Sequence, residues 1–210
     1  MSNLTQDSRS SRQIMTRRIA ATGILIAMAF VLMYYEVPLP FMPAFLKFDF
    51  SEVPVLIGSF AIGPVYGVII ELFKNLIHYP FTGTAGIGEL SNFITGSVYV
   101  FTAGFIYQKI KTRKGAAISM IIATLVLAAI CAPFNYFVTL PLYGSVMHFP
   151  TEAIIGMCNA ANSHVTSKIG VILWVFVPFN LFKGLVVAFI TFWVYKPISR
   201  LIHDTYRKTH

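Results

Sequence analysis

The stretch 52–79, EVPVLIGSFAIGPVYGVIIELFKNLIHY, decides how many times this chain crosses a membrane. It is longer than the ~20 residues of an ordinary span, and Gly63-Pro64 interrupts it. Because proline lacks the N–H that a helix interior needs, we predict a short helix near 53–62, a turn at Gly63-Pro64 and a second helix near 65–79. The alternative is a single kinked helix, which would reverse the topology of everything that follows.

Composition places the rest of the chain in a membrane as well. Of the 210 residues, 56% are hydrophobic and only 11% are charged, whereas soluble domains carry roughly 25% charged residues. So few charges cannot cover a water-facing surface. The apolar runs therefore predict an all-α, multi-pass bundle of six transmembrane helices in the cell membrane, near residues 15–35, 53–62, 65–79, 89–107, 116–138 and 170–195.

The first apolar run also has features of a cleaved signal peptide. Arg17 and Arg18 precede it, and Ala27-Met28-Ala29 resembles a cleavage site. Because the run continues to Met33 and the remaining chain is apolar too, an uncleaved first helix is favoured.

Basic residues decide between six spans and five. They cluster before the first span, in the hairpin 109–114 and after the last span. Six spans place all three clusters on one side, which the positive-inside rule makes the cytoplasm, whereas one helix over 52–79 separates the first cluster from the others. We therefore expect cytoplasmic tails at 1–13 and 203–210 and a membrane domain at 14–202. The net charge of +8 marks this face, and nothing in its pattern points to nucleic acid.

The segments outside the spans differ in character. Residues 36–51 contain Pro38, Pro40 and Pro43, which predict an ordered loop outside the hydrocarbon. Residues 1–13 are expected to be disordered or interfacial, and residues 141–168 to form a long polar loop. The two cysteines, Cys131 and Cys158, fit neither a disulfide framework nor a CxxC metal site.

One polar set lies on the third predicted helix. Placing an ionisable group within a membrane span costs at least about 2.5–3.5 kcal/mol of insertion free energy. The set's spacing of i, i+3, i+4 and i+7 places Glu71, Lys74, Asn75 and His78 on one face. Glu71 and Lys74 can pair, and Glu89 and Asn92 of the next helix can meet them. Glu71, His78 and Glu89 are permissible metal ligands, but their spacing matches no metal motif. A buried polar network and a substrate contact both remain open.

A second polar set consists of Asn135, Asn180 and Lys183. Asn180 and Lys183 lie one turn apart on one face of the last helix. No acidic residue nearby in sequence neutralises Lys183, so we expect a cation that contacts a ligand, with pairing to another helix as the alternative. Asparagine offers a donor and an acceptor, which suits the amide or imide edge of a heterocycle. Aromatic neighbours could contact its ring: Phe45, Phe48, Phe134, Tyr136, Phe179 and Phe182.

The first helix carries Ala20, Gly23 and Ala27 close together. Small residues four positions apart allow close helix–helix approach. This spacing alone is common in apolar helices, and it points to a docking face only if a membrane partner is expected.

Six stretches together resemble the riboflavin-specific substrate-binding subunits of energy-coupling factor (ECF) transporters, the RibU family. They are LKFDFSEVP at 46–54, Gly63-Pro64, ELFKNLIH at 71–78, GIGELSNF at 86–93, PFNY at 133–136 and PFNLFK at 178–183. The resemblance covers roughly residues 15–200.

The resemblance implies a six-helix subunit that binds riboflavin from outside, with flavin mononucleotide as a further candidate ligand. It also implies a transmembrane coupling protein and two cytoplasmic ATPases as partners, and no cofactor. Asn135, Asn180 and Lys183 match the family's flavin-contacting positions. The predicted site is completed by Leu46, Lys47, Phe48 and Asp49 of the first loop and by Glu89, Asn92, Phe134 and Tyr136. Gly23 stands where the family's docking face has an Ala-x-x-x-Ala pattern.

Other functions remain open at this stage. The same class of subunit could bind a different vitamin. A membrane-embedded enzyme could use Glu71, His78 and Glu89, although HExxH and GxSxG motifs are missing from the sequence, and a channel or structural subunit is a third class. The sequence has no GxxxxGK[ST] phosphate loop, so ATP hydrolysis by that route must come from a partner.

Overall fold

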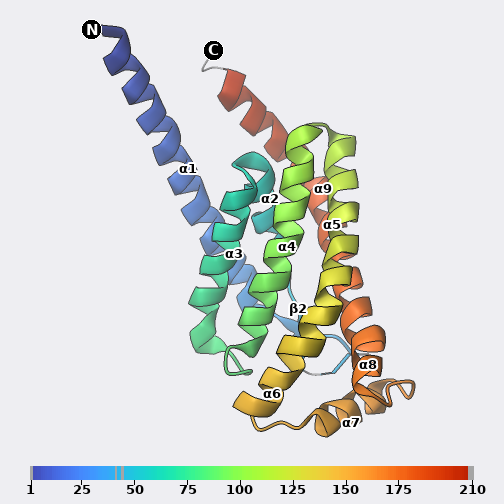
Figure 1. Cartoon of the computed structure of the whole chain (residues 1–210). Coiled ribbons are helices and arrows are strands. Elements are labelled where there is room, and N and C mark those ends of the chain that lie inside the picture. The colour runs from blue at the N-terminus through green and yellow to red at the C-terminus, as the bar shows by residue number, and fades with distance from the viewer. Residues whose placement is uncertain (1, 41, 44, 208–210) are drawn as a thin grey trace.

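The computed structural model describes the backbone of residues 2–40, 42–43 and 45–207, with side chains within 12–194. Over these residues the fold is all-α, as predicted, apart from a short pair of strands (Figure 1). The helices are α1 (Ser2–Tyr34), α2 (Glu52–Ala61), α3 (Pro64–His78), η1 (Tyr79–Phe81), α4 (Ile87–Lys109), α5 (Arg113–Phe134), α6 (Leu140–Val146), α7 (Thr151–Ala161), α8 (Lys168–Val171) and α9 (Val177–Arg207). Two π-helical turns, η2 (Asn135–Thr139) and η3 (Ile172–Phe176), join α5 to α6 and α8 to α9.

The predicted break at Gly63-Pro64 is confirmed. Gly63 has a φ of 143°, a conformation that favours glycine because other residues would place a Cβ against the backbone. Pro64 then begins α3, where its missing N–H costs no hydrogen bond. The short helix α2 is buried from Glu52 to Phe60 and packs against α1, α3, α4 and α9.

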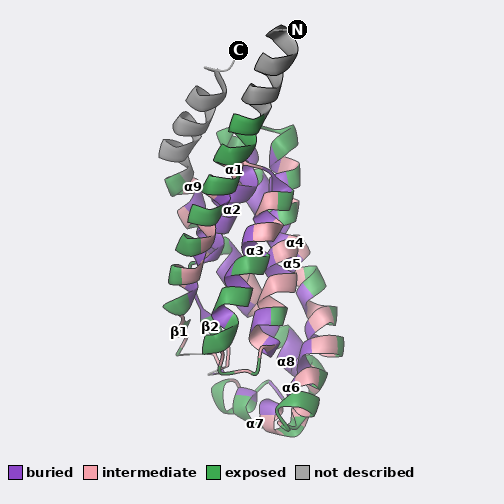
Figure 2. Ribbon diagram, turned by 90° about the vertical axis from the view of Figure 1, so that its left-hand side faces the viewer, coloured by how far each residue is buried: buried purple, intermediate pink, exposed green. Residues whose placement is uncertain are grey.

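The basic clusters gather at one end of the bundle. The N-terminal end of α1, the turn between α4 and α5 and the C-terminal end of α9 lie together at the top of Figure 1, and α6 and α7 lie at the opposite end. Three helical stretches are long and apolar enough to cross a membrane: Arg12–Tyr34, Arg113–Val146 and Lys168–Val194. From Arg12 to Tyr34, helix α1 is largely exposed (Figure 2).

Two segment predictions need correction. Residues 2–13, expected to be disordered or interfacial, are helical, and no glycine or proline interrupts α1 before Gly23. The expected loop 141–168 instead contains α6, in which Pro141 occupies the tolerated first turn, and α7, which buries Ile154 and Cys158. Helix α9 continues to Arg207, and the limits of the membrane domain at 14 and 202 stay a prediction. Met1 and residues 208–210, in the two predicted tails, lie outside the described residues.

Candidate functional site

A cavity lies at the end of the bundle near α6, between the first loop, the 82–88 loop, helices α4, α6 and α9 and the π-helical turns η2 and η3. The space inside it, including the open solvent at its mouth, is about 820 Å³. Its lining residues are Met33, Glu36, Phe45, Leu46, Lys47, Asp49, Thr82, Gly83, Thr84, Gly88, Glu89, Ser91, Asn92, Thr95, Asn135, Thr139, Tyr143, Phe176, Phe179, Asn180 and Lys183.

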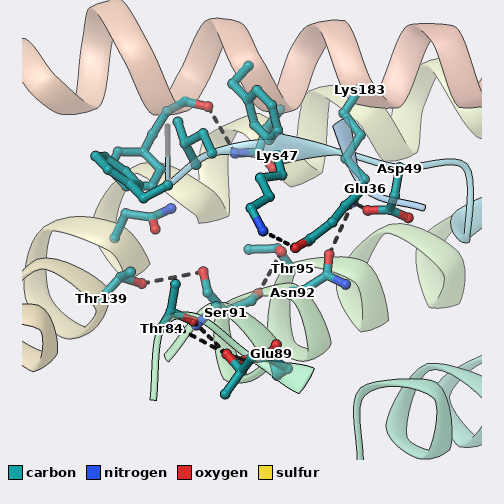
Figure 3. Close-up of a pocket in the computed structure, with 18 of the residues that line it drawn as sticks. Glu36, Lys47, Asp49, Thr84, Glu89, Ser91, Asn92, Thr95, Thr139 and Lys183 are labelled. Atoms are coloured by element: carbon teal, nitrogen blue, oxygen red, sulfur yellow. Dashed lines mark hydrogen bonds and ion pairs between the residues drawn. The ribbon is translucent and has the colours of Figure 1, made fainter. Parts of the chain in front are cut away.

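The first loop forms one wall of this cavity. Its strands β1 (Val37–Pro38) and β2 (Lys47–Phe48) pair antiparallel, and Lys47 forms an ion pair with Glu36 across them (Figure 3). Phe45 packs on Phe176, with ring centroids 6.2 Å apart. The described residues of the loop therefore pack against the bundle, as expected for the ordered loop that its prolines predict.

Lys183 is paired, which contradicts the expectation of an unpaired cation. Its Nζ lies 2.9 Å from Asp49 Oδ2 and 3.2 Å from Asn92 Oδ1 (Figure 3). Burial alone would raise the pKa of Asp49, but Lys183, Lys74 and the hydrogen bond from Ser51 hold it well below its usual range. The pair connects α9 to the first loop, and Lys183 still lines the cavity.

Asn135, at the start of η2, and Asn180, on α9, stand close together. The Nδ2 of Asn135 donates to the Cys131 carbonyl at 2.7 Å, while its Oδ1 is buried with no hydrogen-bond partner among the described residues. The Nδ2 of Asn180 donates to the Phe176 carbonyl at 2.9 Å and to Cys131 Sγ at 3.3 Å. Because a buried polar atom without a partner is costly, the Asn135 oxygen indicates a place for a ligand donor.

The polar face of α3 forms a buried network, as one of the two sequence interpretations proposed. Lys74 Nζ lies 2.9 Å from Glu71 Oε2, 2.7 Å from Glu52 Oε1 and 2.8 Å from Ser51 Oγ. The predicted Glu71–Lys74 pair is therefore confirmed, and Lys74 also holds the start of α2. These groups are almost fully buried and do not line the cavity.

Helices α3 and α4 also meet through polar groups, as predicted. Asn92 Nδ2 donates to Asn75 Oδ1 at 3.2 Å, and His78 Nδ1 lies 2.9 Å from Glu89 Oε1. Thr82 donates to Glu89 Oε2 at 2.7 Å. Asn92 thus touches both α3 and Lys183, and it links the buried network to the cavity.

Most of the predicted ligand residues line the cavity, and three do not. Those that line it are Leu46, Lys47, Asp49, Glu89, Asn92, Asn135, Asn180 and Lys183. Phe48 instead packs against Phe182, with ring centroids 5.7 Å apart. Tyr136 lies under Lys168, whose Nζ is 4.1 Å from the ring centroid, and the half-buried Phe134 is also absent from the lining. On the π-helical turn, Asn135 faces inward while its neighbours face elsewhere.

Sequence reasoning missed several lining residues. The 82–88 loop contributes Thr82, Gly83, Thr84 and Gly88, the first loop contributes Glu36, and helices contribute Ser91, Thr95, Thr139 and Tyr143 among others. The Gly/Thr-rich composition of that loop was the available signal. It could not show that the loop folds back over the start of α4.

The residues of the alternative enzyme hypothesis do not share one cavity. Glu71 is fully buried against Lys74, and of Glu71, His78 and Glu89 only Glu89 lines the cavity. Among the side chains that the structure describes, within 12–194, no cluster of three His, Cys, Asp or Glu residues could hold a metal ion.

The predicted docking residues lie on the exposed side of α1. Ala20, Gly23 and Ala27 are all exposed, and a Cβ added at Gly23 would meet nothing within 4 Å. The face is therefore free in the single chain, and its docking role stays a prediction.

Comparison with known proteins decides the family. Residues 17–195 match the family model "ECF transporter, substrate-specific component". The chain belongs to this family. It is therefore a transporter subunit of the membrane and not an enzyme, which sets aside the role considered for Glu71, His78 and Glu89.

Individual relatives and a solved structure agree. The chain is 34% identical to "Riboflavin transporter RibU" of Staphylococcus aureus (strain TCH60), over 89% of this chain and 92% of the relative. It is 32% identical to "Riboflavin transporter FmnP" of Bacillus subtilis (strain 168), over 82% and 86%. A solved structure described as "Structure and mechanism of the S component of a bacterial ECF transporter" matches with a TM-score of 0.71 and 33% identity, over 90% of this chain and 98% of that one.

Proposed function

We propose that this protein captures riboflavin from outside the cell and delivers it for uptake with an ECF coupling protein and two ATPases. Relatives at 32–34% identity are named riboflavin transporters. The observation that carries the proposal is the unpartnered oxygen of Asn135 beside Asn180 and Lys183 in one cavity. An imide N–H supplies the donor that the oxygen lacks, and ribityl hydroxyls can bond the charged and hydroxyl groups around it.

The proposed topology has six spans with both termini in the cytoplasm. Because η1 continues α3, η2 joins α5 to α6 and η3 joins α8 to α9, the described helices form seven continuous segments. One of them, α7, is short and lies at the end of the bundle away from the termini (Figure 1). The remaining six correspond to the predicted spans. With the basic ends in the cytoplasm, the cavity near α6 opens to the outside, which suits capture.

Charge in the cavity favours riboflavin over flavin mononucleotide. Two lysines line it, but Lys47 pairs with Glu36 and Lys183 pairs with Asp49, and Glu89 adds a third carboxylate. A phosphate dianion would meet these carboxylates without a free cation to balance it. We therefore expect weaker binding of the mononucleotide.

The test is flavin binding by the purified protein in detergent. We expect saturable quenching of riboflavin fluorescence, and loss of about tenfold in affinity in Asn135→Ala. Asn159→Ala is the matched control, because this asparagine supports the turn at 163–165 by donating to Ser163 and Val165 carbonyls. Absence of saturable riboflavin binding would refute the proposal, and tighter binding of thiamine or biotin would transfer it to another vitamin.

A further inference from the structure

Cys131 is a buried thiol that touches both asparagines of the cavity, and the transport function gives it no role by itself. Its carbonyl accepts from Asn135 Nδ2 at 2.7 Å, and its Sγ accepts from Asn180 Nδ2 at 3.3 Å. The same Sγ lies 3.8 Å from the Phe176 carbonyl, which it can donate to. The residue is fully buried, so these contacts are made away from water.

These contacts fix which edge of each amide faces the cavity. An asparagine amide has two N–H donors and one carbonyl acceptor. Asn180 Nδ2 donates to both the Phe176 carbonyl and Cys131 Sγ. Asn135 Nδ2 donates to the Cys131 carbonyl. Turning either amide over would set its oxygen against a backbone carbonyl oxygen, that of Phe176 for Asn180 and that of Cys131 for Asn135, and both carbonyls are acceptors only. Each amide therefore keeps its carbonyl oxygen for the cavity.

The local backbone supports this arrangement. Asn135 begins the π-helical turn η2, and Phe176 ends the π-helical turn η3. Such turns occur within α-helices frequently at functional sites. Cys131 joins these two turns across the gap between α5 and α9.

We infer that Cys131 is a positioning residue, which holds Asn135 and Asn180 so that both present an acceptor to the ligand. This rests on the proposed function, and it adds a specificity rule to it. The site selects a heterocycle whose edge carries an N–H donor, and it rejects the same ring when that nitrogen is blocked.

The test compares riboflavin with riboflavin methylated at the imide nitrogen N3, in wild type and Cys131→Ala. Without the thiol, the Asn180 amide loses one of its two anchors and can rotate. We expect riboflavin affinity to fall about tenfold, the loss of one hydrogen bond, while the affinity for the methylated analogue changes less than about threefold. The ratio of the two Kd values, which is the measured quantity, then falls about tenfold.

Two further variants complete the design. Cys131→Ser keeps a group that donates and accepts, and we expect it to restore the ratio to within about threefold of wild type. Cys158→Ala is the matched control, because Cys158 is also a fully buried free cysteine but lies on α7, outside the cavity. It should leave the ratio unchanged.

The outcomes separate this inference from the function on which it rests. Wild-type protein that binds riboflavin, together with a Cys131→Ala variant that weakens both flavins equally, would make the thiol merely structural and overturn the inference alone. An unchanged ratio in Cys131→Ala would do the same. Wild-type protein that binds neither flavin would overturn the proposed function first.

Discussion

The pair between Lys183 and Asp49 gives the sharpest prediction, because one residue serves both the fold and the site. Both side chains are at most 10% exposed and their charged atoms are 2.9 Å apart. Removing one partner of a buried pair typically costs about 3–5 kcal/mol. In Lys183→Met, Asp49 keeps the Ser51 N–H as a donor at 2.8 Å, so we expect the low end, about 3 kcal/mol of unfolding free energy.

The partner variant should cost less. In Asp49→Asn, Lys183 keeps Asn92 Oδ1 at 3.2 Å and Glu52 Oε1 at 3.9 Å, so we expect a loss of about 1–2 kcal/mol. The double variant leaves no orphaned charge and should lose only about 2 kcal/mol, which gives a coupling energy near 2 kcal/mol. Because folding lowers the pKa of Asp49, its stabilisation is present near neutral pH and is lost in acid as the pH falls through the folded-state pKa.

Unfolding in mixed detergent micelles at pH 7 measures the free energies, and flavin fluorescence measures affinity. Lys183→Met should weaken riboflavin binding about ten- to hundredfold, and the double variant should recover stability without recovering affinity. Additive unfolding energies, within about 0.5 kcal/mol, would show that the pair does not hold the loop. Recovery of affinity in the double variant would show that Lys183 acts only through Asp49.

Three further perturbations test the bundle and its partner face. Lys74→Met should lower the free energy of unfolding by about 3–5 kcal/mol, because two buried carboxylates lose their ammonium partner. Glu71→Gln removes one of these two carboxylates and should lower the free energy of unfolding clearly less in the same assay. Gly104→Ala should cost about 1–3 kcal/mol, because its Cβ would lie 2.0 Å from Ser59 Oγ; Gly156→Ala, with open space around it, is the control. Gly23→Leu should leave riboflavin binding intact and abolish ATP-driven uptake, with Gly156→Leu as the control, and retained uptake would place docking on another face.

The helices were predictable because a bilayer constrains each segment separately. A span must satisfy its own backbone, so apolar length and breakers such as Gly63-Pro64 locate it without knowledge of its neighbours. The same reasoning failed for α6 and α7, which lie at the end of the bundle in the segment predicted to be a polar loop. Their composition predicted a loop, whereas burial of Ile154 and Cys158 stabilises a helix there.

The site was predictable only as far as residue chemistry allows. Polar groups that hydrocarbon rejects had to face the interior, and this reasoning placed Asn135, Asn180 and Lys183 in one cavity. It could not supply their partners. Asp49 is 134 positions from Lys183, and no local spacing relates a loop residue to a helix so far along the chain.

The partners that sequence reasoning could not identify change the role of Lys183. A search confined to nearby sequence finds no counter-charge, and an isolated cation then indicates a ligand. In the folded chain the Lys183 ammonium already pairs with the Asp49 carboxylate. A ligand at Lys183 must therefore share the ammonium with Asp49 or displace the Asp49 carboxylate. Binding at Lys183 therefore acts on the same ion pair that fastens the first loop to α9. That connection, between ligand contact and loop, exists only in three dimensions and is what the double-variant comparison measures.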